Sequence, residues 1–229
     1  MHIGHNNIQH NYTMVNHQLV ATEEQRDLGI TITRDLKWQK QTEKSCGTAN
    51  RVLGFIARNF NNKSTELMPP LYKSLLRPNV EYALQFWPPH LRRDIDKMER
   101  VQRRATKMIP EIRNHSHLER LKDLKLISLV QRRLLRQLIE VFKYLNRFNN
   151  VSPIGLFDYD LNDRTRNNGK KWIVKRFNTS VAQHFFPTNI TTTWNALPYD
   201  LVNSGTVNIF NNHLDAHWED NPPDVLVNW

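Results

Sequence analysis

The stretch LRRDIDKMERVQRRATKMI, residues 91–109, has the clearest helical period in the chain. Apolar side chains recur in it every three or four residues, which is the spacing of one face of a helix. These side chains are Ile95, Met98, Val101, Ala105, Met108 and Ile109. Most of the Lys and Arg side chains lie off this stripe, and Pro110 ends the pattern. The stretch therefore predicts a basic amphipathic helix.

Further helices are predicted on both sides of this stretch. They span about 36–60, 64–76, 116–123 and 128–147. Asp35 is a candidate N-cap for the first of them, and Arg77-Pro78 is expected to stop the second. The longest, 128–147, has its own apolar stripe with arginines elsewhere on its surface. We expect these helices to pack as a small bundle.

The two ends of the chain have a different pattern. Tyr12–Val15 and Leu19-Val20 flank a polar turn at 16–18, and Leu28, Ile30 and Ile32 alternate as in a half-buried strand. After residue 149 the sequence predicts short extended pieces around 185–198 and a last helix from Thr206 to Trp218. The expected fold class is mainly α with a short N-terminal β-hairpin (α+β). Its expected divisions are 1–35, 36–149 and 150–229.

The positive charge is concentrated in one segment. The chain has 32 Lys and Arg against 22 Asp and Glu, a net charge of +10. Residues 92–147 hold sixteen of the cations and seven of the acids. Such a concentration favours a polyanionic partner, nucleic acid above all, although a solvated helix exterior is the alternative. The residues predicted to contact phosphate are Arg100, Arg103, Arg104, Lys107, Arg132, Arg133 and Arg136.

Other chemistries find little support in the sequence. A single cysteine, Cys46, excludes an intramolecular disulfide and a Cys-only zinc site. His213 and His217 are four residues apart but lack the rest of a zinc motif, and Asp158, Asp160 and Asp163 lack the Gly and Glu of a calcium loop. No catalytic residue, metal ligand or cofactor is predicted in this chain. Trp87, Trp194 and Trp218 are expected to close a core, with base stacking as the alternative.

A set of short motifs occurs in the order found in one known family. They are DLGI at 27–30, LGFIAR at 53–58, LYKSLLRP at 71–78, VEY at 80–82, WPP at 87–89, ERVQRRATK at 99–107, Arg120-Leu121 with Leu124 and Leu126, Arg132-Arg133, and TWNALP at 193–198. With this ordered set, the chain resembles the reverse transcriptases of non-LTR retrotransposons (LINE elements) of the jockey and chicken-repeat type. The likeness covers roughly residues 1–218.

The resemblance implies a place in a larger RNA-directed DNA polymerase. Residues 1–35 would be the end of the palm, 36–149 a helical thumb that holds the template–primer duplex, and 150–229 a C-terminal connector. The family's palm holds two Mg²⁺ ions with an aromatic-x-Asp-Asp turn and an upstream Asp. This chain contains no Asp-Asp pair, so Mg²⁺ is expected only in the missing palm. The chain alone is expected to be inactive, with the palm and fingers as its other partners.

Two other functions remain open from the sequence. The first is a stand-alone helical nucleic-acid-binding or scaffold protein from a decayed element, whose basic surface meets RNA, an acidic protein or anionic lipid. The second is a His-dependent metallohydrolase. No apolar run approaches the roughly 20 residues that cross a bilayer, and no hydrophobic signal core is present. We therefore expect an intracellular protein, cytoplasmic or nuclear, that is neither secreted nor inserted in a membrane.

Overall fold

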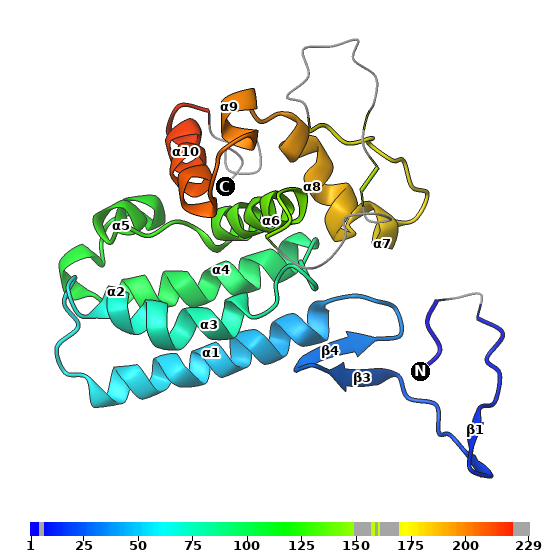
Figure 1. Cartoon of the computed structure of the whole chain (residues 1–229). Helices are drawn as coiled ribbons and strands as arrows, with labels where there is room; N and C mark the ends of the chain where they lie inside the picture. Colours follow the sequence, from blue (N-terminus) through cyan, green and yellow to red (C-terminus); the bar gives the residue numbers. More distant parts are fainter. Residues whose placement is uncertain (5–6, 149–156, 159, 161–169, 222–229) are drawn as a thin grey trace. The chain divides into compact units, whose positions relative to one another are not determined.

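The structure, a computed structural model, describes residues 1–4, 7–148, 157–158, 160 and 170–221. The chain forms two compact units, Met1–Leu126 (unit 1) and Ile127–Trp229 (unit 2). The described residues are mainly helical, with two short antiparallel hairpins near the N-terminus (Figure 1), which confirms the predicted fold class. The predicted division 36–149 takes in parts of both units.

Unit 1 begins with the two hairpins. They are formed by β1 (Thr13–Met14) with β2 (His17–Gln18), and by β3 (Glu24–Asp27) with β4 (Ile30–Thr33). The predicted turn at 16–18 is wrong, because Val15 and Asn16 take the positive φ values that close the first hairpin. Leu28 was predicted to lie in a half-buried strand, but it forms the second turn with Gly29 and is exposed.

The helices of unit 1 follow β4. They are α1 (Gln39–Asn59), α2 (Met68–Leu71), α3 (Arg77–Glu81), α4 (Arg92–Lys107) and α5 (His117–Asp123), with a π-helical turn η1 (Tyr72–Leu76) and a 3₁₀ turn η2 (Pro110–Ile112). Helices α1, α3 and α4 lie side by side in Figure 1. The predicted helices at 36–60, 91–109 and 116–123 are confirmed, each within three residues of its bounds.

Two of the predicted helix ends are wrong. Asp35 does not cap α1: its carboxylate accepts hydrogen bonds from Thr33 Oγ1 (2.7 Å) and the Lys37 backbone N–H (3.2 Å), and the helix begins after Trp38. The second helix does not stop at Arg77-Pro78, since α2, η1 and α3 follow one another without a break. Pro78, which has no backbone N–H to donate, comes just after the π-helical turn, where the Arg77 N–H donates to the Tyr72 carbonyl five residues earlier.

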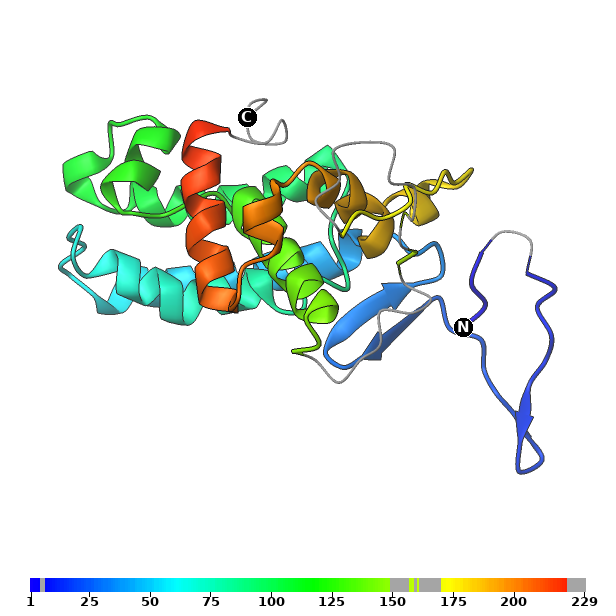
Figure 2. The ribbon, with the colours of Figure 1, turned by 45° about the horizontal axis from the view of Figure 1, so that its top comes forward.

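Unit 2 contains α6 (Leu129–Leu145), α7 (Ser180–Gln183), α8 (Phe186–Asn195), α9 (Tyr199–Val202) and α10 (Val207–Asp220). Helix α6, which confirms the helix predicted at 128–147, packs against α8 and α10 (Figure 2). The core of the unit holds a series of stacked rings. Neighbouring rings in it are Phe142 with Phe210, Phe210 with Trp194, Trp194 with Trp172, and Trp172 with Phe157.

The extended pieces predicted around 185–198 are wrong, because most of these residues form α8. The threonine-rich run has a high β propensity, but Ile190 and Trp194 are four residues apart and both are fully buried on one helix face. Pro187 lies in the first turn of α8, and its carbonyl accepts a hydrogen bond from Thr191 Oγ1 (2.6 Å). Burial of the two large side chains therefore decides the conformation.

Candidate nucleic-acid interface

Helix α4 presents a strip of four exposed cations. Its buried face carries Met98, Val101 and Ala105, and holds the helix against the rest of unit 1. The strip on the outer face consists of Arg100, Arg103, Arg104 and Lys107, all four of which the sequence predicts as phosphate contacts. Within the described residues, no carboxylate lies at ion-pair distance from any of them. Their charge is therefore available to a ligand.

A polar seam between α1 and α4 fixes the position of this strip. Lys97 Nζ lies 3.0 Å from Glu43 Oε1, Arg104 Nη1 donates to Asn50 Oδ1 (2.8 Å), and Arg93 donates to Gln39. Each pair is separated by 54 residues, so the two helices run in the same direction in a constant register. The hydrogen bonds from Lys97 and Gln39 lower the pKa of Glu43, which stays ionised and offsets the charge of Lys97.

Helix α1 adds a second row of exposed cations that the sequence analysis missed. The row consists of Lys40, Lys44, Arg51 and Arg58. Lys40 is paired with Glu24 (2.7 Å), whereas the other three have no carboxylate at ion-pair distance among the described residues. The steps of four, seven and seven residues place these side chains along one side of a helix. That spacing is the signal from which the row could have been predicted.

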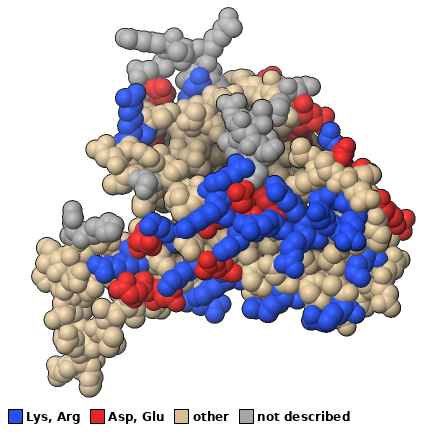
Figure 3. All heavy atoms as spheres, turned by 180° about the vertical axis from the view of Figure 1, so that it is seen from behind, with Lys and Arg blue, Asp and Glu red and all other residues tan. Residues whose placement is uncertain are grey.

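Small side chains separate the two rows. Gly47, Asn50 and Gly54 share one stripe of α1, and Asn50 contacts α4 through Arg104. A Cβ at Gly47 would meet nothing within 4 Å, and one at Gly54 would meet only the Arg58 guanidinium, at 3.4 Å. We call the α4 strip together with Lys44, Arg51 and Arg58 the basic face. Figure 3 shows Lys and Arg side chains gathered over this part of unit 1.

The other three predicted contacts lie in unit 2. Arg132, Arg133 and Arg136 are close together on α6, and all three are half-buried. The four cations of α4, in contrast, are exposed. The structure thus brings the predicted residues together in two groups, one on each unit.

Arg120, part of the Arg120-Leu121 motif, joins two helices of unit 1 and does not lie on the exposed surface. Its guanidinium is buried, donates to Thr106 Oγ1 on α4 (3.1 Å) and to the His115 carbonyl, and so ties α5 to α4. Burial, and to a smaller extent the charge of Arg103, lowers its pKa.

The described residues contain no group of three or more His, Cys, Asp or Glu side chains that could hold a metal ion. His213 is exposed, and its Nδ1 lies 3.3 Å from Oγ of the buried Ser204. Asp158 forms an ion pair with Lys175, and Asp163 lies outside the described residues. Burial raises the pKa of Cys46 to about 11, so its thiolate is scarce at neutral pH and the residue is a poor nucleophile.

The tryptophans belong to the core, as predicted. Trp87 and Trp194 are fully buried and Trp218 is nearly so. The indole N–H of Trp87 donates to the Tyr82 carbonyl (2.7 Å), and that of Trp194 donates to the Lys170 carbonyl (3.0 Å). None of the three rings is available for stacking on a base.

Among the helices of the described part of the chain, none combines the length and the apolar character that crossing a bilayer requires. Comparisons of the chain with protein-family models, with curated proteins and with solved structures give no match.

Proposed function

We propose that this protein binds the sugar-phosphate backbone of a nucleic-acid duplex through the basic face, as the thumb-like part of a reverse transcriptase of the non-LTR retrotransposon type. The observation that carries the proposal is the strip of four exposed α4 cations without a carboxylate partner among the described residues. The ordered sequence motifs support the polymerase assignment. Mg²⁺ and the catalytic carboxylates would belong to the palm, and the intracellular location stays a prediction.

The chemistry of the basic face suits a phosphate backbone. A duplex carries closely spaced phosphates, and each Lys or Arg that neutralises one releases condensed counterions. On a helix with a rise of about 1.5 Å per residue, the α4 strip extends over about 10 Å, long enough for several phosphates. Phosphate contacts fix the position of a protein on a duplex without reading its sequence, which is what holding a template–primer during synthesis requires.

The position of the ERVQRRATK motif in the structure supports a role in binding the phosphate backbone. The segment ERVQRRATK, residues 99–107, forms the part of α4 that bears the exposed strip. In contrast, Trp87 of WPP and Trp194 of TWNALP are buried. In this proposal the first motif binds the ligand, and the other two maintain the folded units that present it.

The test compares the wild-type protein with Arg103→Glu/Arg104→Glu on a DNA duplex and an RNA–DNA hybrid over a salt series. We expect weaker binding at every salt concentration and a plot of log affinity against log salt that is shallower by about 1.8, since each contact contributes about 0.9. The control, Lys175→Glu/Arg176→Glu, removes the same charge from exposed residues of unit 2 and should change binding little.

Two results would overturn the proposal. One is an affinity and a salt dependence that Arg103→Glu/Arg104→Glu leaves unchanged. The other is binding to anionic phospholipid vesicles that is as tight as binding to the duplex, which would indicate a membrane surface as the partner.

A further inference from the structure

A broad groove lies beside the basic face on unit 1. Its volume is about 920 Å³, near the upper end of the ~300–1,000 Å³ typical of ligand sites. Its walls come from α1, from the end of α3 and from the turn of the β3–β4 hairpin. Gly47 and Glu43, at the edge of the α1–α4 seam, line it on one side, and Tyr82 and Gly29 line it on the other. The groove therefore continues from the basic face across α1.

Three cations line this groove: Arg26, Lys44 and Arg51. Lys44 Nζ donates to Thr31 Oγ1 (2.9 Å) and Arg51 donates to Thr48 Oγ1 (2.9 Å), which orients both side chains through neutral partners. No carboxylate of the described residues is within ion-pair distance of any of the three. Glu43, the acidic side chain in the lining, is bound to Lys97. The groove is thus suited to an anion.

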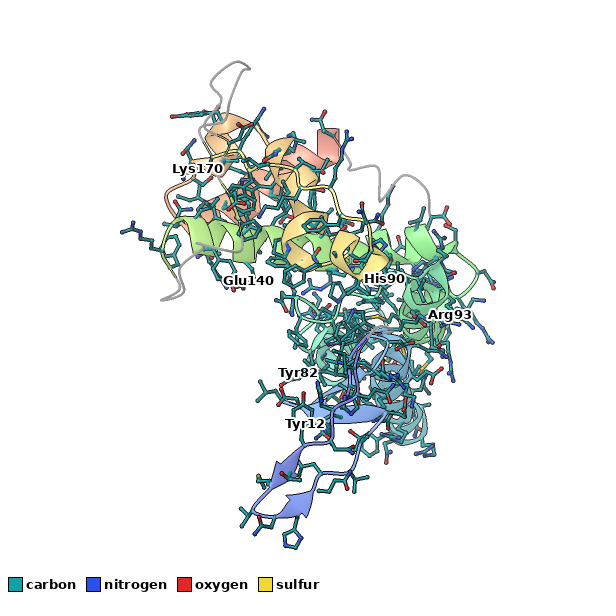
Figure 4. The ribbon with its side chains drawn as sticks, turned by 90° about the vertical axis from the view of Figure 1, so that its right-hand side faces the viewer. Tyr12, Tyr82, His90, Arg93, Glu140 and Lys170 are labelled. Atoms are coloured by element: carbon teal, nitrogen blue, oxygen red, sulfur yellow. The ribbon has the colours of Figure 1, made fainter. Side chains whose placement is uncertain are left out.

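The exposed ring of Tyr82 gives the groove an aromatic surface. Its hydroxyl donates to the Leu28 carbonyl (2.9 Å), which holds the ring beside the hairpin turn (Figure 4). Gly29 has φ +84°, and a Cβ there would lie 3.4 Å from Tyr82 Cε1, so the glycine allows the close approach of the turn to the ring. Tyr82 remains 55% exposed. The turn contacts the ring at Cε1 and at the hydroxyl, and the residue as a whole stays exposed.

We infer that this groove binds an unpaired nucleic-acid strand, with a base stacked on Tyr82 and the backbone phosphates held by Lys44 and Arg51. In a duplex the base faces are covered by their neighbours, whereas a single strand offers them to an aromatic side chain. Lys44 and Arg51 belong both to the groove and to the basic face. A single strand that leaves a duplex bound to the basic face can therefore enter the groove. This part of the inference rests on the proposed function, which places the duplex on the basic face.

The test measures binding of three probes: a short oligothymidylate, an abasic oligonucleotide of the same length, and a duplex. The variants are Tyr82→Leu, which removes the ring, Tyr82→Phe, which keeps the ring without its hydroxyl, and Arg51→Gln. Tyr82→Leu should weaken oligothymidylate binding about tenfold, because one base–aromatic stack contributes about 1–3 kcal/mol. It should leave binding of the abasic probe and of the duplex unchanged. Tyr82→Phe keeps the ring but loses the hydrogen bond to the Leu28 carbonyl, so it should weaken oligothymidylate binding less than Tyr82→Leu does. Arg51→Gln should weaken binding of both single-stranded probes.

Failure of this inference can be told apart from failure of the proposed function. An equal loss for the oligothymidylate and the abasic probe in Tyr82→Leu, or no loss for either, overturns stacking in the groove. The duplex arm with Arg103→Glu/Arg104→Glu tests the basic face independently. A circular dichroism spectrum of each variant identifies a loss of binding that is due to unfolding. If Tyr82→Leu is unfolded, Arg51→Gln and Tyr82→Phe still test whether the groove binds the single-stranded probes.

Discussion

Helices α4 and α6 are both Arg-rich amphipathic helices of similar length, 16 and 17 residues, yet they present their arginines differently. On α4 the arginines of the strip are exposed, and on α6 Arg132, Arg133 and Arg136 are half-buried. Every residue of α6 is buried or half-buried, whereas α4 leaves one side of the helix exposed, so more of the circumference of α6 is covered. The arginines of such a helix are thus accessible to a ligand only where its neighbours leave them exposed.

The cores of the two units differ as well. Unit 1 buries polar side chains of α4, among them Asp94, Glu99 and Gln102, along with its apolar stripe. Unit 2 buries the stacked rings around Trp172 and Trp194. Unit 2 should therefore depend on a few large aromatic side chains, and unit 1 on a wider set of smaller contacts.

The largest effect is expected from Trp194→Ala. This ring is fully buried and stacks on both Trp172 and Phe210, and its removal should cost about 3–5 kcal/mol. Near-ultraviolet circular dichroism during thermal unfolding should show the loss of unit 2 structure, while duplex binding by the basic face is retained. Trp194→Phe keeps a ring in the stack and should cost less. Simultaneous unfolding of both units in Trp194→Ala would show that unit 1 depends on unit 2 for its stability.

The second largest effect is expected from charge reversal on α4, and the same change on α6 tests the comparison of the two helices. Arg103→Glu/Arg104→Glu on α4 should weaken duplex binding about tenfold or more near physiological salt. Arg132→Glu/Arg133→Glu on α6 makes the same change of charge where the side chains are half-buried, and should weaken binding less. Fluorescence anisotropy with one labelled duplex measures both variants. An equal or larger loss of affinity for the α6 variant would show that the exposure of an arginine does not determine its contribution to duplex binding.

A smaller effect concerns Cys46 and the pH dependence of stability. Its pKa is raised by burial to about 11, against about 8.5 for an accessible thiol. Folding therefore favours the neutral thiol, and this contribution is complete below about pH 8.5 and is lost as the pH rises toward 11. The free energy of unfolding should fall over this range, and less steeply in Cys46→Ala. Denaturant titrations of both proteins at several pH values measure the difference, and parallel curves would rule out the contribution of the thiol.

The smallest effect is expected from Gly47→Ala on α1. Nothing lies within 4 Å of the added Cβ, and alanine is favoured over glycine inside a helix by up to about 1 kcal/mol. The free energy of unfolding of unit 1 should rise by an amount of this order, with the spectrum of unit 2 unchanged. Gly54→Ala, whose Cβ meets the Arg58 guanidinium, is the matched comparison. A decrease in stability for Gly47→Ala would mean that the position is more crowded than the structure indicates.

Much of the fold follows from local sequence patterns. The stripe of α4 and the stop at Pro110 place that helix to within a few residues, and the Ser116–Glu119 capping box marks the start of α5. The threonine-rich run of α8 and the π-helical turn before Pro78 depend on tertiary packing, and local propensity gives the wrong answer there. Local patterns fail where buried side chains outweigh local preference.

The candidate site could be predicted in part. Exposure of Arg100, Arg103, Arg104 and Lys107 follows from their positions off the apolar stripe. Helix α6 packs against α8 and α10, which lie more than forty residues later in the chain, and a local pattern does not contain such neighbours. The groove at Tyr82 also joins distant segments, since Gly29 and Tyr82 are brought together by the β3–β4 turn and α3.

The constant offset of 54 residues between α1 and α4 has a consequence for folding. Parallel neighbours need a returning segment between them, and this segment contains α2, η1 and α3. Contacts that are so far apart in sequence slow folding, because loop closure must precede them. The two rows of cations are neighbours only in folded unit 1, so a nucleic acid that recognises both rows selects the completed unit over its partly folded forms. By mass action, such a ligand raises the unfolding temperature of unit 1 in proportion to the logarithm of its concentration well above Kd.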